Sequence, residues 1–112
     1  MVKIIRWEEV KKIHKVISGV SVKNKKIRSL LCSKGKNNRY PNQIFKNEII
    51  YYVDGSTMQG GITALINSIG TDHTFPVFHK LGVNQWINLG DYKIACMNQE
   101  DKLYISFQLL KQ

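Results

Sequence analysis

The N-terminal stretch has the apolar spacing of an amphipathic helix. Trp7, Val10, Ile13 and Ile17 recur every three or four residues, and charged residues fall between them. Acidic residues occupy the first turn and lysines the later turns, which is the order that the helix dipole favours. The pattern predicts a helix over Trp7–Ser18 that ends at Gly19. The short apolar run Val2–Ile5 before it fits a first strand.

Residues 20–46 show no sustained period, and we expect irregular structure there. Two short apolar pieces, Val20–Val22 and Ile27–Cys32, lie among lysines. Ser33–Asn42 follows as a polar, basic loop that contains Gly, Pro and several Asn. Backbone amides, amide side chains and cations in such a loop can all contact phosphates. A plain surface loop, with its Tyr-Pro pair packed inward, fits the composition equally well.

The rest of the chain predicts one more helix and several strands. Glu48–Val53 is β-branched and aromatic and is followed by an Asp-Gly turn. A glycine-rich loop then leads into apolar positions that predict a short helix over Gly60–Ile69. Four strands are expected after it: Phe75–Leu81, with a proline that suits a sheet edge, Gln85–Leu89, Asp91–Met97 and Lys102–Leu110. The predicted class is α+β, a curved antiparallel sheet or small barrel with an N-terminal amphipathic helix and one short helix.

Charge is distributed very unevenly along the 112 residues, whose net charge is +9. Residues 1–46 hold 13 basic and two acidic residues, a net of +11, whereas residues 47–112 hold four basic and six acidic residues, a net of −2. Such clustering favours an anionic partner, most simply nucleic acid. The alternative is a solvated basic helix with no partner. The length suits one domain, so residues 1–112 are expected to fold as a single unit.

Cysteine usage and hydropathy indicate a reducing compartment. The two cysteines, Cys32 and Cys96, are 64 residues apart and show no metal-binding spacing. The N-terminus lacks the apolar run of a signal peptide, and the longest uninterrupted apolar run, Ile49–Val53, is too short to span a membrane. We therefore expect a cytoplasmic protein that does not bind membranes.

No catalytic or metal-binding motif stands out. His14, beside the apolar stripe of the first helix, is better explained as a helix-flank residue than as a ligand, and His73 and His79 lack a third ligand at a useful spacing. Ser56 is not in a GxSxG pattern, and the glycine-rich loop lacks the lysine of a phosphate-binding loop. We expect a protein that is not an enzyme and has no metal or cofactor.

The segment from Asn47 to Met97 resembles the SRA-like branch of the PUA superfamily. The resemblance rests on Tyr51-Tyr-Val-Asp-Gly55, Gln59-Gly-Gly61, an Asn in the short helix (Asn67), Phe75-Pro-Val-Phe-His79, and Trp86-Ile-Asn-Leu-Gly-Asp-Tyr-Lys-Ile94. The sequence departs from the family where Ser-Thr-Met replaces a glycine and where the RYDG-like signature of eukaryotic members is absent. Recognition of 5-methylcytosine in particular is therefore not implied.

What the resemblance implies is a non-catalytic module for double-stranded DNA that recognises a modified or flipped base, as the specificity domain of a restriction or defence system. A nuclease domain in the same or another chain would then be a partner. Such recognition needs aromatic walls, polar groups for the base edge and a cationic rim. The expected base pocket is Tyr51, Tyr52, Asp54, Ser56, Thr57, Gln59, Phe78 and Trp86, and the expected backbone contacts are Lys34, Lys36, Asn37, Asn38, Arg39, Tyr40 and Lys80. Some of the aromatics must also fill the core. An RNA-binding PUA-like module and a small basic inhibitor of an acidic protein remain alternatives.

Overall fold

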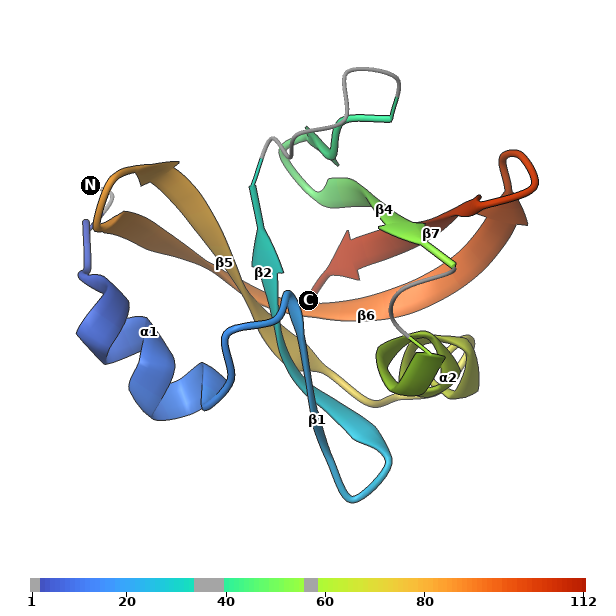
Figure 1. Ribbon diagram of the computed structural model, residues 1–112, viewed down its shortest axis with the longest axis horizontal. Coiled ribbons are helices and arrows are strands. Elements are labelled where there is room, and N and C mark those ends of the chain that lie inside the picture. The colour runs from blue at the N-terminus through green and yellow to red at the C-terminus, as the bar shows by residue number, and fades with distance from the viewer. Residues whose placement is uncertain (1–2, 34–39, 56–58) are drawn as a thin grey trace.

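The protein is a strongly curved, open seven-stranded sheet with one helix on each side (Figure 1). The computed structural model describes residues 3–33, 40–55 and 59–112. Its elements are α1 (Trp7–His14), β1 (Val20–Lys23), β2 (Lys26–Cys32), β3 (Gln43–Ile44), β4 (Glu48–Asp54), α2 (Gln59–Asn67), β5 (Phe75–Gly82), β6 (Gln85–Gln99) and β7 (Tyr104–Lys111). The strand order is β1-β2-β5-β6-β7-β4-β3, and every neighbouring pair is antiparallel except β2 and β5. The predicted class, α+β with a curved sheet, is confirmed.

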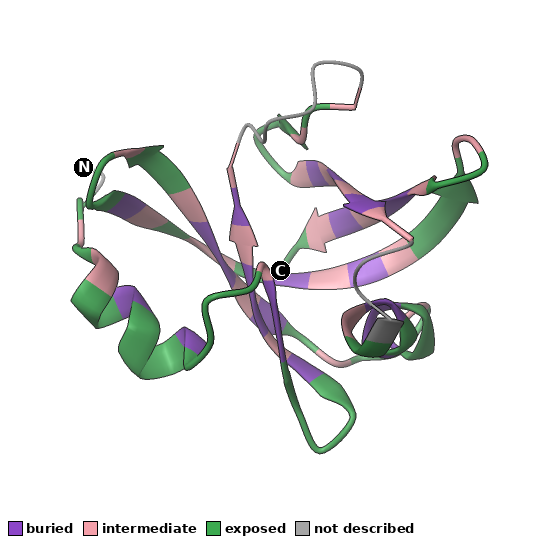
Figure 2. Ribbon diagram, viewed as in Figure 1, coloured by how far each residue is buried: buried purple, intermediate pink, exposed green. Residues whose placement is uncertain are grey.

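The main core lies inside the curl of the sheet and is closed by α2. Alternate residues of β4 (Ile49, Tyr51 and Val53) point into it, together with Phe107 and Leu109 of β7. A second, smaller core lies on the opposite face, where Val10 of α1 packs on Phe78 and Trp86. Figure 2 shows the resulting alternation of buried and exposed positions along the strands. Neither helix of the described chain is long and apolar enough to cross a lipid bilayer.

The first helix is shorter than predicted. It ends at His14 because Lys15 adopts a left-handed conformation, with φ of 69°, and its N–H caps Lys11 O at 2.9 Å. Ile17, which was expected to extend the apolar stripe, has an exposed side chain. The expected strand at Val2–Ile5 is reduced, within the described residues, to one bridge between Ile5 and Trp86.

The region expected to be irregular contains the β1–β2 hairpin and the short strand β3. The hairpin turns at Asn24-Lys25, where both residues have positive φ (53° and 66°). Turns of this kind usually contain Asn-Gly. Because lysine stands at the second position here, the sequence does not predict the turn.

Three strand predictions need correction. The two strands expected over residues 85–97 are one long strand, β6, which bends at Gly90 (φ 103°). The strand with Pro76 is not at an edge, since β5 lies between β2 and β6. The proline is tolerated because the ladder with β2 begins only at Val77.

Candidate functional site

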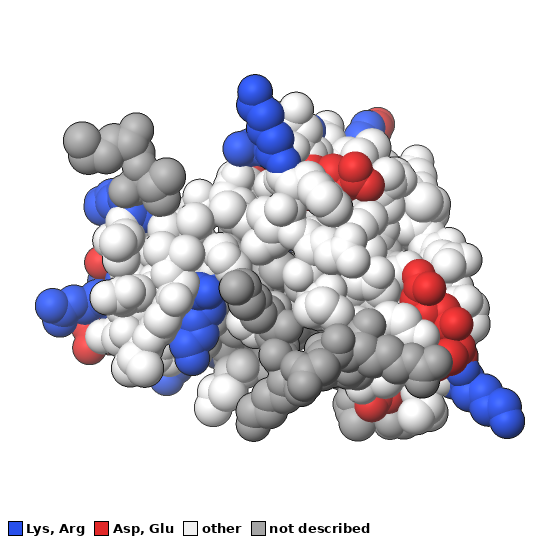
Figure 3. Space-filling view, turned by 90° about the horizontal axis from the view of Figure 1, so that it is seen from above, with Lys and Arg blue, Asp and Glu red and all other residues white. Residues whose placement is uncertain are grey.

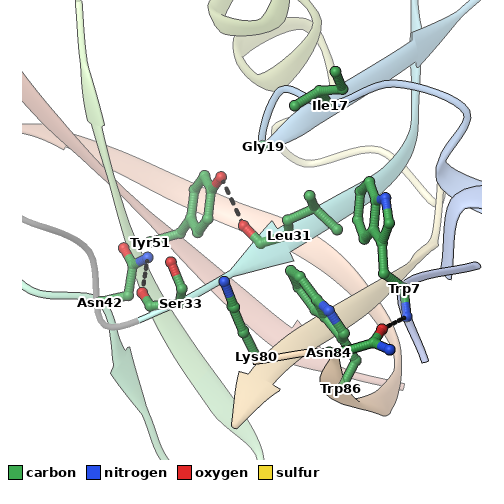
Figure 4. A pocket seen from close by; sticks show the side chains of 10 residues that line it. All are labelled: Trp7, Ile17, Gly19, Leu31, Ser33, Asn42, Tyr51, Lys80, Asn84 and Trp86. Carbon is green, nitrogen blue, oxygen red and sulfur yellow. Dashed lines mark hydrogen bonds between the residues drawn. The ribbon is translucent and has the colours of Figure 1, made fainter. Parts of the chain in front are cut away.

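A pocket of about 660 Å³ opens between the α1 side of the molecule and the curl of the sheet (Figure 4). It lies where the link between α1 and β1, the end of β2, the segment before β3, and the β5–β6 hairpin come together. Residues from six separate segments of the chain build it. Its lining is Trp7, Ile17, Gly19, Leu31, Ser33, Asn42, Tyr51, Lys80, Asn84 and Trp86.

One wall of the pocket is aromatic and carries a cation. The rings of Trp7 and Trp86 lie 5.4 Å apart, tilted by 38°, and Lys80 Nζ lies 5.9 Å from the Trp86 ring centre. Trp7 is held at the start of α1 because its backbone N–H donates to Asn84 Oδ1 at 2.8 Å. Two backbone hydrogen bonds between Ile5 and Trp86, of 2.7 and 2.9 Å, fix the chain that leads into α1. This wall offers flat apolar surface beside a positive charge, which suits the face of a nucleobase and a nearby phosphate.

The opposite wall is polar, and its polar groups are hydrogen-bonded within the protein. Tyr51 is 4% exposed, and its hydroxyl donates to Leu31 O at 3.2 Å. Burial, and to a lesser extent the nearby Cys32, raise the pKa of Tyr51, so its hydroxyl remains a neutral donor. Asn42 Nδ2 donates to Ser33 O at 2.9 Å, and Asn42 Oδ1 accepts from the backbone N–H of Tyr52 at 2.9 Å. Asn42 thereby ties together the two ends of the 34–39 segment at the pocket wall.

The link between α1 and β1 forms the mouth of the pocket. Ile17 is 86% exposed, which is unusual for an isoleucine that borders a pocket. Gly19 lies so close to Tyr51 that a Cβ atom there would be 3.0 Å from the hydroxyl oxygen. Glycine is needed here for close approach, not for a special backbone conformation.

The predicted base-pocket residues do not all come together. Tyr51 and Trp86 line the pocket. Tyr52, the next residue of β4, points to the other face, because side chains alternate along a strand. Asp54 lies at the end of β4, where it pairs with Tyr104. Phe78 has no exposed surface and belongs to the core under α1, so it cannot form a pocket wall in this conformation.

Tyr52 belongs instead to a separate tyrosine stack. Its ring lies 5.4 Å from that of Tyr40, and Tyr40 lies 5.1 Å from Tyr104. All three side chains are half-buried. Tyr40 was expected to contact the DNA backbone, and here it joins β4 and β7 to the segment that follows the basic loop.

Of the expected backbone contacts, Lys80 is exposed and lines the pocket. The other predicted site residues lie outside the described residues, as does the side chain of Gln59. These residues are Lys34, Lys36, Asn37, Asn38, Arg39, Ser56 and Thr57. The flanks of the basic loop are described, however, and both Ser33 and Asn42 line the pocket. The loop therefore begins and ends at this site.

Sequence reasoning missed several pocket residues. Trp7 was assigned only to the apolar stripe of the helix, and Asn84 only to a turn. Ile17 and Gly19 were assigned to the end of a helix that in fact stops earlier. No sequence pattern marks these residues, because each is of a type that is ordinary in a helix or a turn. Only the fold brings them beside β2 and β4.

The described part of the chain keeps the charge asymmetry of the sequence. Residues 3–33 carry nine basic and two acidic residues, a net of +7. In Figure 3 acidic side chains gather at the right-hand end of this face beside a Lys or Arg side chain, and several Lys and Arg side chains lie at the left-hand end and at the top. The excess of basic residues in residues 3–33 includes those of α1, whose first residue, Trp7, lines the pocket.

The remaining polar candidates have structural partners. His73 Nε2 lies 2.6 Å from Ile27 O, and His79 Nδ1 lies 3.0 Å from Cys32 O. Both cysteines are free, with Cys32 buried and Cys96 exposed. Among the described residues, no cluster of His, Cys, Asp and Glu is arranged to hold a metal ion.

The fold is SRA-like. No protein-family model matches the chain, and no curated protein sequence matches it significantly. The fold is similar to that of the SUVH5 SRA domain in complex with methylated CHH DNA, at a TM-score of 0.78 and 21% identity over 96% of this chain and 83% of that one. It is also similar to SUVH5 SRA bound to fully hydroxymethylated CG DNA (TM-score 0.77, 18% identity, 96% and 84% covered).

A longer protein also contains this fold. Arabidopsis thaliana SUVH6, in complex with SAM, matches at a TM-score of 0.72 and 20% identity over 95% of this chain. Only 24% of the SUVH6 chain is covered. The predicted resemblance to SRA domains is confirmed at the level of the fold.

Proposed function

We propose that this protein is a double-stranded-DNA-binding module that recognises a modified or flipped base. The observation that carries the proposal is the pocket between the tryptophan wall and Tyr51, which both flanks of the basic loop border. Support comes from the fold, since the similar SRA domains are in complexes with methylated or hydroxymethylated DNA. Residues 1–112 would act as one DNA-binding domain.

In this proposal the base lies in the pocket and the duplex lies across its mouth. The partly exposed ring of Trp7 provides stacking surface, Trp86, which is 7% exposed, supports it from behind, and polar groups on the Tyr51 side meet the edge of the base. Ile17, exposed at the mouth, can enter the space that a flipped base leaves in the stack, as apolar wedges do in other DNA-bending proteins. Tyr52, Asp54, Ser56, Thr57 and Gln59 would then act outside this pocket or at its rim.

The cationic rim would come from the basic loop and from β5. Lys34, Lys36, Asn37, Asn38 and Arg39 would contact the DNA backbone together with Lys80, which lies at the pocket itself. These contacts carry no sequence information, but they provide most of the affinity and make it depend on salt.

The wider role follows from the same proposal. A module that reads bases without altering them would serve a restriction or defence system, with a nuclease domain in the same or another chain. The two free thiols are compatible with the reducing cytoplasm.

The test is fluorescence anisotropy with labelled duplexes that differ only in one base: unmodified, methylated or hydroxymethylated cytosine, or methylated adenine. We expect tighter binding to one modified duplex, and a steep loss of affinity between 50 and 200 mM salt, about a thousandfold for six phosphate contacts. Stronger binding to structured RNA would favour the RNA-binding alternative. If neither nucleic acid binds at 50 mM salt, the proposal is wrong, and an acidic protein partner becomes the better hypothesis.

Two adjacent residues test the position of the base. Tyr51→Phe removes a hydroxyl inside the pocket, and Tyr52→Phe removes one from the tyrosine stack on the other face. We expect only Tyr51→Phe to reduce the preference for the modified duplex. If only Tyr52→Phe reduces this preference, the base is recognised at the tyrosine stack and not in the pocket.

A further inference from the structure

His14, the last residue of α1, uses both ring nitrogens inside the protein. Its side chain has no exposed surface. Nδ1 lies 2.5 Å from Ser29 Oγ of β2, and Nε2 lies 2.6 Å from the backbone oxygen of Ser18. The ring therefore joins the end of α1 both to the sheet and to the link that follows the helix.

These partners fix the tautomer of the neutral ring. The Ser18 oxygen can only accept, so Nε2 carries the hydrogen and donates it. Nδ1 then has a lone pair and accepts from the Ser29 hydroxyl, which can donate. The sequence interpretation of His14 as a helix-flank residue holds, but the residue is also an anchor.

The link over residues 15–19 depends on such backbone contacts. None of residues 15–18 is buried, so apolar packing does little to hold the link in place. Two of its carbonyl groups accept hydrogen bonds, Ser18 O from His14 and Gly19 O from Leu31 N at 2.7 Å. The same link supplies Ile17 and Gly19 to the pocket.

We infer that His14 is a positioning residue for the pocket, and that its protonation releases the 15–19 link and lowers affinity for the bound base. The part of this inference that concerns affinity for the base rests on the proposed function. A proton on Nδ1 would convert that atom from acceptor to donor and place a positive charge in a buried position. The charge would then be relieved by moving the ring toward water, which frees Ser18 O and lets the link at the mouth of the pocket move.

The surroundings of His14 favour this response. Burial lowers the pKa of His14, the hydrogen bond to Ser18 opposes that shift, and Arg28 of β2 lowers the pKa further. The charged residues nearest in sequence on α1 and its cap, Lys11, Lys12 and Lys15, are cationic too. Among the described residues, no carboxylate hydrogen-bonds to the ring to stabilise an imidazolium.

The first experiment uses the free protein and follows amide hydrogen exchange of Leu31, whose N–H donates to Gly19 O. The Leu31 protection factor is measured at pH 7.5 and 5.5, with a Phe107 amide in the β4–β7 ladder as the reference for global opening. We expect the wild-type Leu31 protection to fall by about fivefold or more in acid while staying below that of Phe107 at both pH values, which shows that Leu31 exchanges by opening of the link and not by global unfolding. His14→Gln, which can still donate to Ser18 O without titrating, should keep its protection at both pH values.

A matched control and a disruptive variant sharpen the result. His73→Gln changes a histidine that bonds a backbone oxygen near the β1–β2 turn, so it should keep the wild-type acid response. His14→Leu, which cannot donate, should lower Leu31 protection already at pH 7.5. Equal acid loss in wild type and His14→Gln, or no loss in either, would overturn the inference.

The second experiment repeats the pH series with the best-bound duplex at constant salt. Wild-type affinity should fall about fivefold more than that of His14→Gln between pH 7.5 and 5.5. An identical fall in both proteins would refute the coupling of His14 to DNA binding. If no duplex binds at any pH while the exchange result holds, the proposed function fails, and the positioning role of His14 stands.

Discussion

The close approach of Gly19 to Tyr51 leads to a prediction about two coupled substitutions. In Gly19→Ala, the new Cβ would lie 3.0 Å from Tyr51 Oη and 3.7 Å from Leu31 O. The Tyr51 hydroxyl must then move by a few tenths of an ångström, which breaks its 3.2 Å hydrogen bond to Leu31 O. Overpacking destabilises the fold by about 1–3 kcal/mol and loss of the hydrogen bond by about 1 kcal/mol. Alanine also lowers the conformational entropy of the unfolded chain, which stabilises the fold by about 0.4–1 kcal/mol. We expect Gly19→Ala to lower the free energy of unfolding by about 1–3.5 kcal/mol.

Tyr51→Phe should relieve this conflict. Alone it costs about 1 kcal/mol, because it removes the hydrogen bond to Leu31 O. In that background Gly19→Ala meets no hydroxyl, so the double variant should be at least about 1 kcal/mol more stable than the sum of the single effects.

Urea unfolding of the four proteins, with a constant denaturant slope, measures this coupling. The control is Gly60→Ala at the start of α2, where an added Cβ meets nothing within 4 Å. It should stabilise the protein by up to about 1 kcal/mol, as alanine does within a helix. A Gly19→Ala protein as stable as wild type, or single effects that add within about 0.5 kcal/mol, would refute the packing described for this wall.

Four further predictions concern single side chains. Because the pKa of His14 is lowered in the folded state, His14 should stabilise the fold fully above about pH 6.5. Below that pH the free energy of unfolding should fall by at most about 1.4 kcal/mol per pH unit. In His14→Gln the urea midpoint should depend less on pH over that range. Lys80→Gln should reduce the slope of log affinity against log salt by about 0.9 for a lost phosphate contact, whereas Lys102→Gln on the β6–β7 turn should leave it unchanged. Ile17→Ser should weaken binding to the preferred duplex at unchanged stability, because its side chain is 86% exposed, and equal binding would exclude a wedge. A thiol reagent at pH 8 should modify Cys96 in the native protein but Cys32 only after unfolding, because burial raises the pKa of Cys32 to about 12.

Much of the fold could be predicted because periodic patterns report local burial. The alternation in Glu48–Val53 corresponds to β4, and the apolar spacing after the glycine-rich loop corresponds to α2. The errors fall where tertiary contacts override local signals. The β1–β2 hairpin turns on two positive-φ residues that lack a glycine, and β6 continues through Gly90, a residue that usually signals a break.

The candidate site was harder to predict, because its residues meet only through topology. The parallel pairing of β2 with β5 brings Leu31 beside Phe78, and the next strand of the sheet brings Trp86 near α1. A strand pattern shows that Tyr51 and Tyr52 face opposite ways, but it does not show which of them faces the pocket. That choice depends on the register between β4 and β7, where Tyr51 pairs with the buried Phe107.

The excess positive charge and the pocket are parts of one arrangement, which bears on the alternative of a merely solvated basic helix. A helix that served only solubility would need an apolar stripe and nothing more. In α1, Val10 fills the second core, but Trp7 forms a pocket wall and His14 anchors the link that carries Ile17 and Gly19. The lysines on the outer face of this helix are thus attached to an element that shapes the pocket. A loss of α1 packing should therefore reduce base discrimination and salt-dependent affinity together, whereas neutralising the exposed lysines alone should reduce only the affinity.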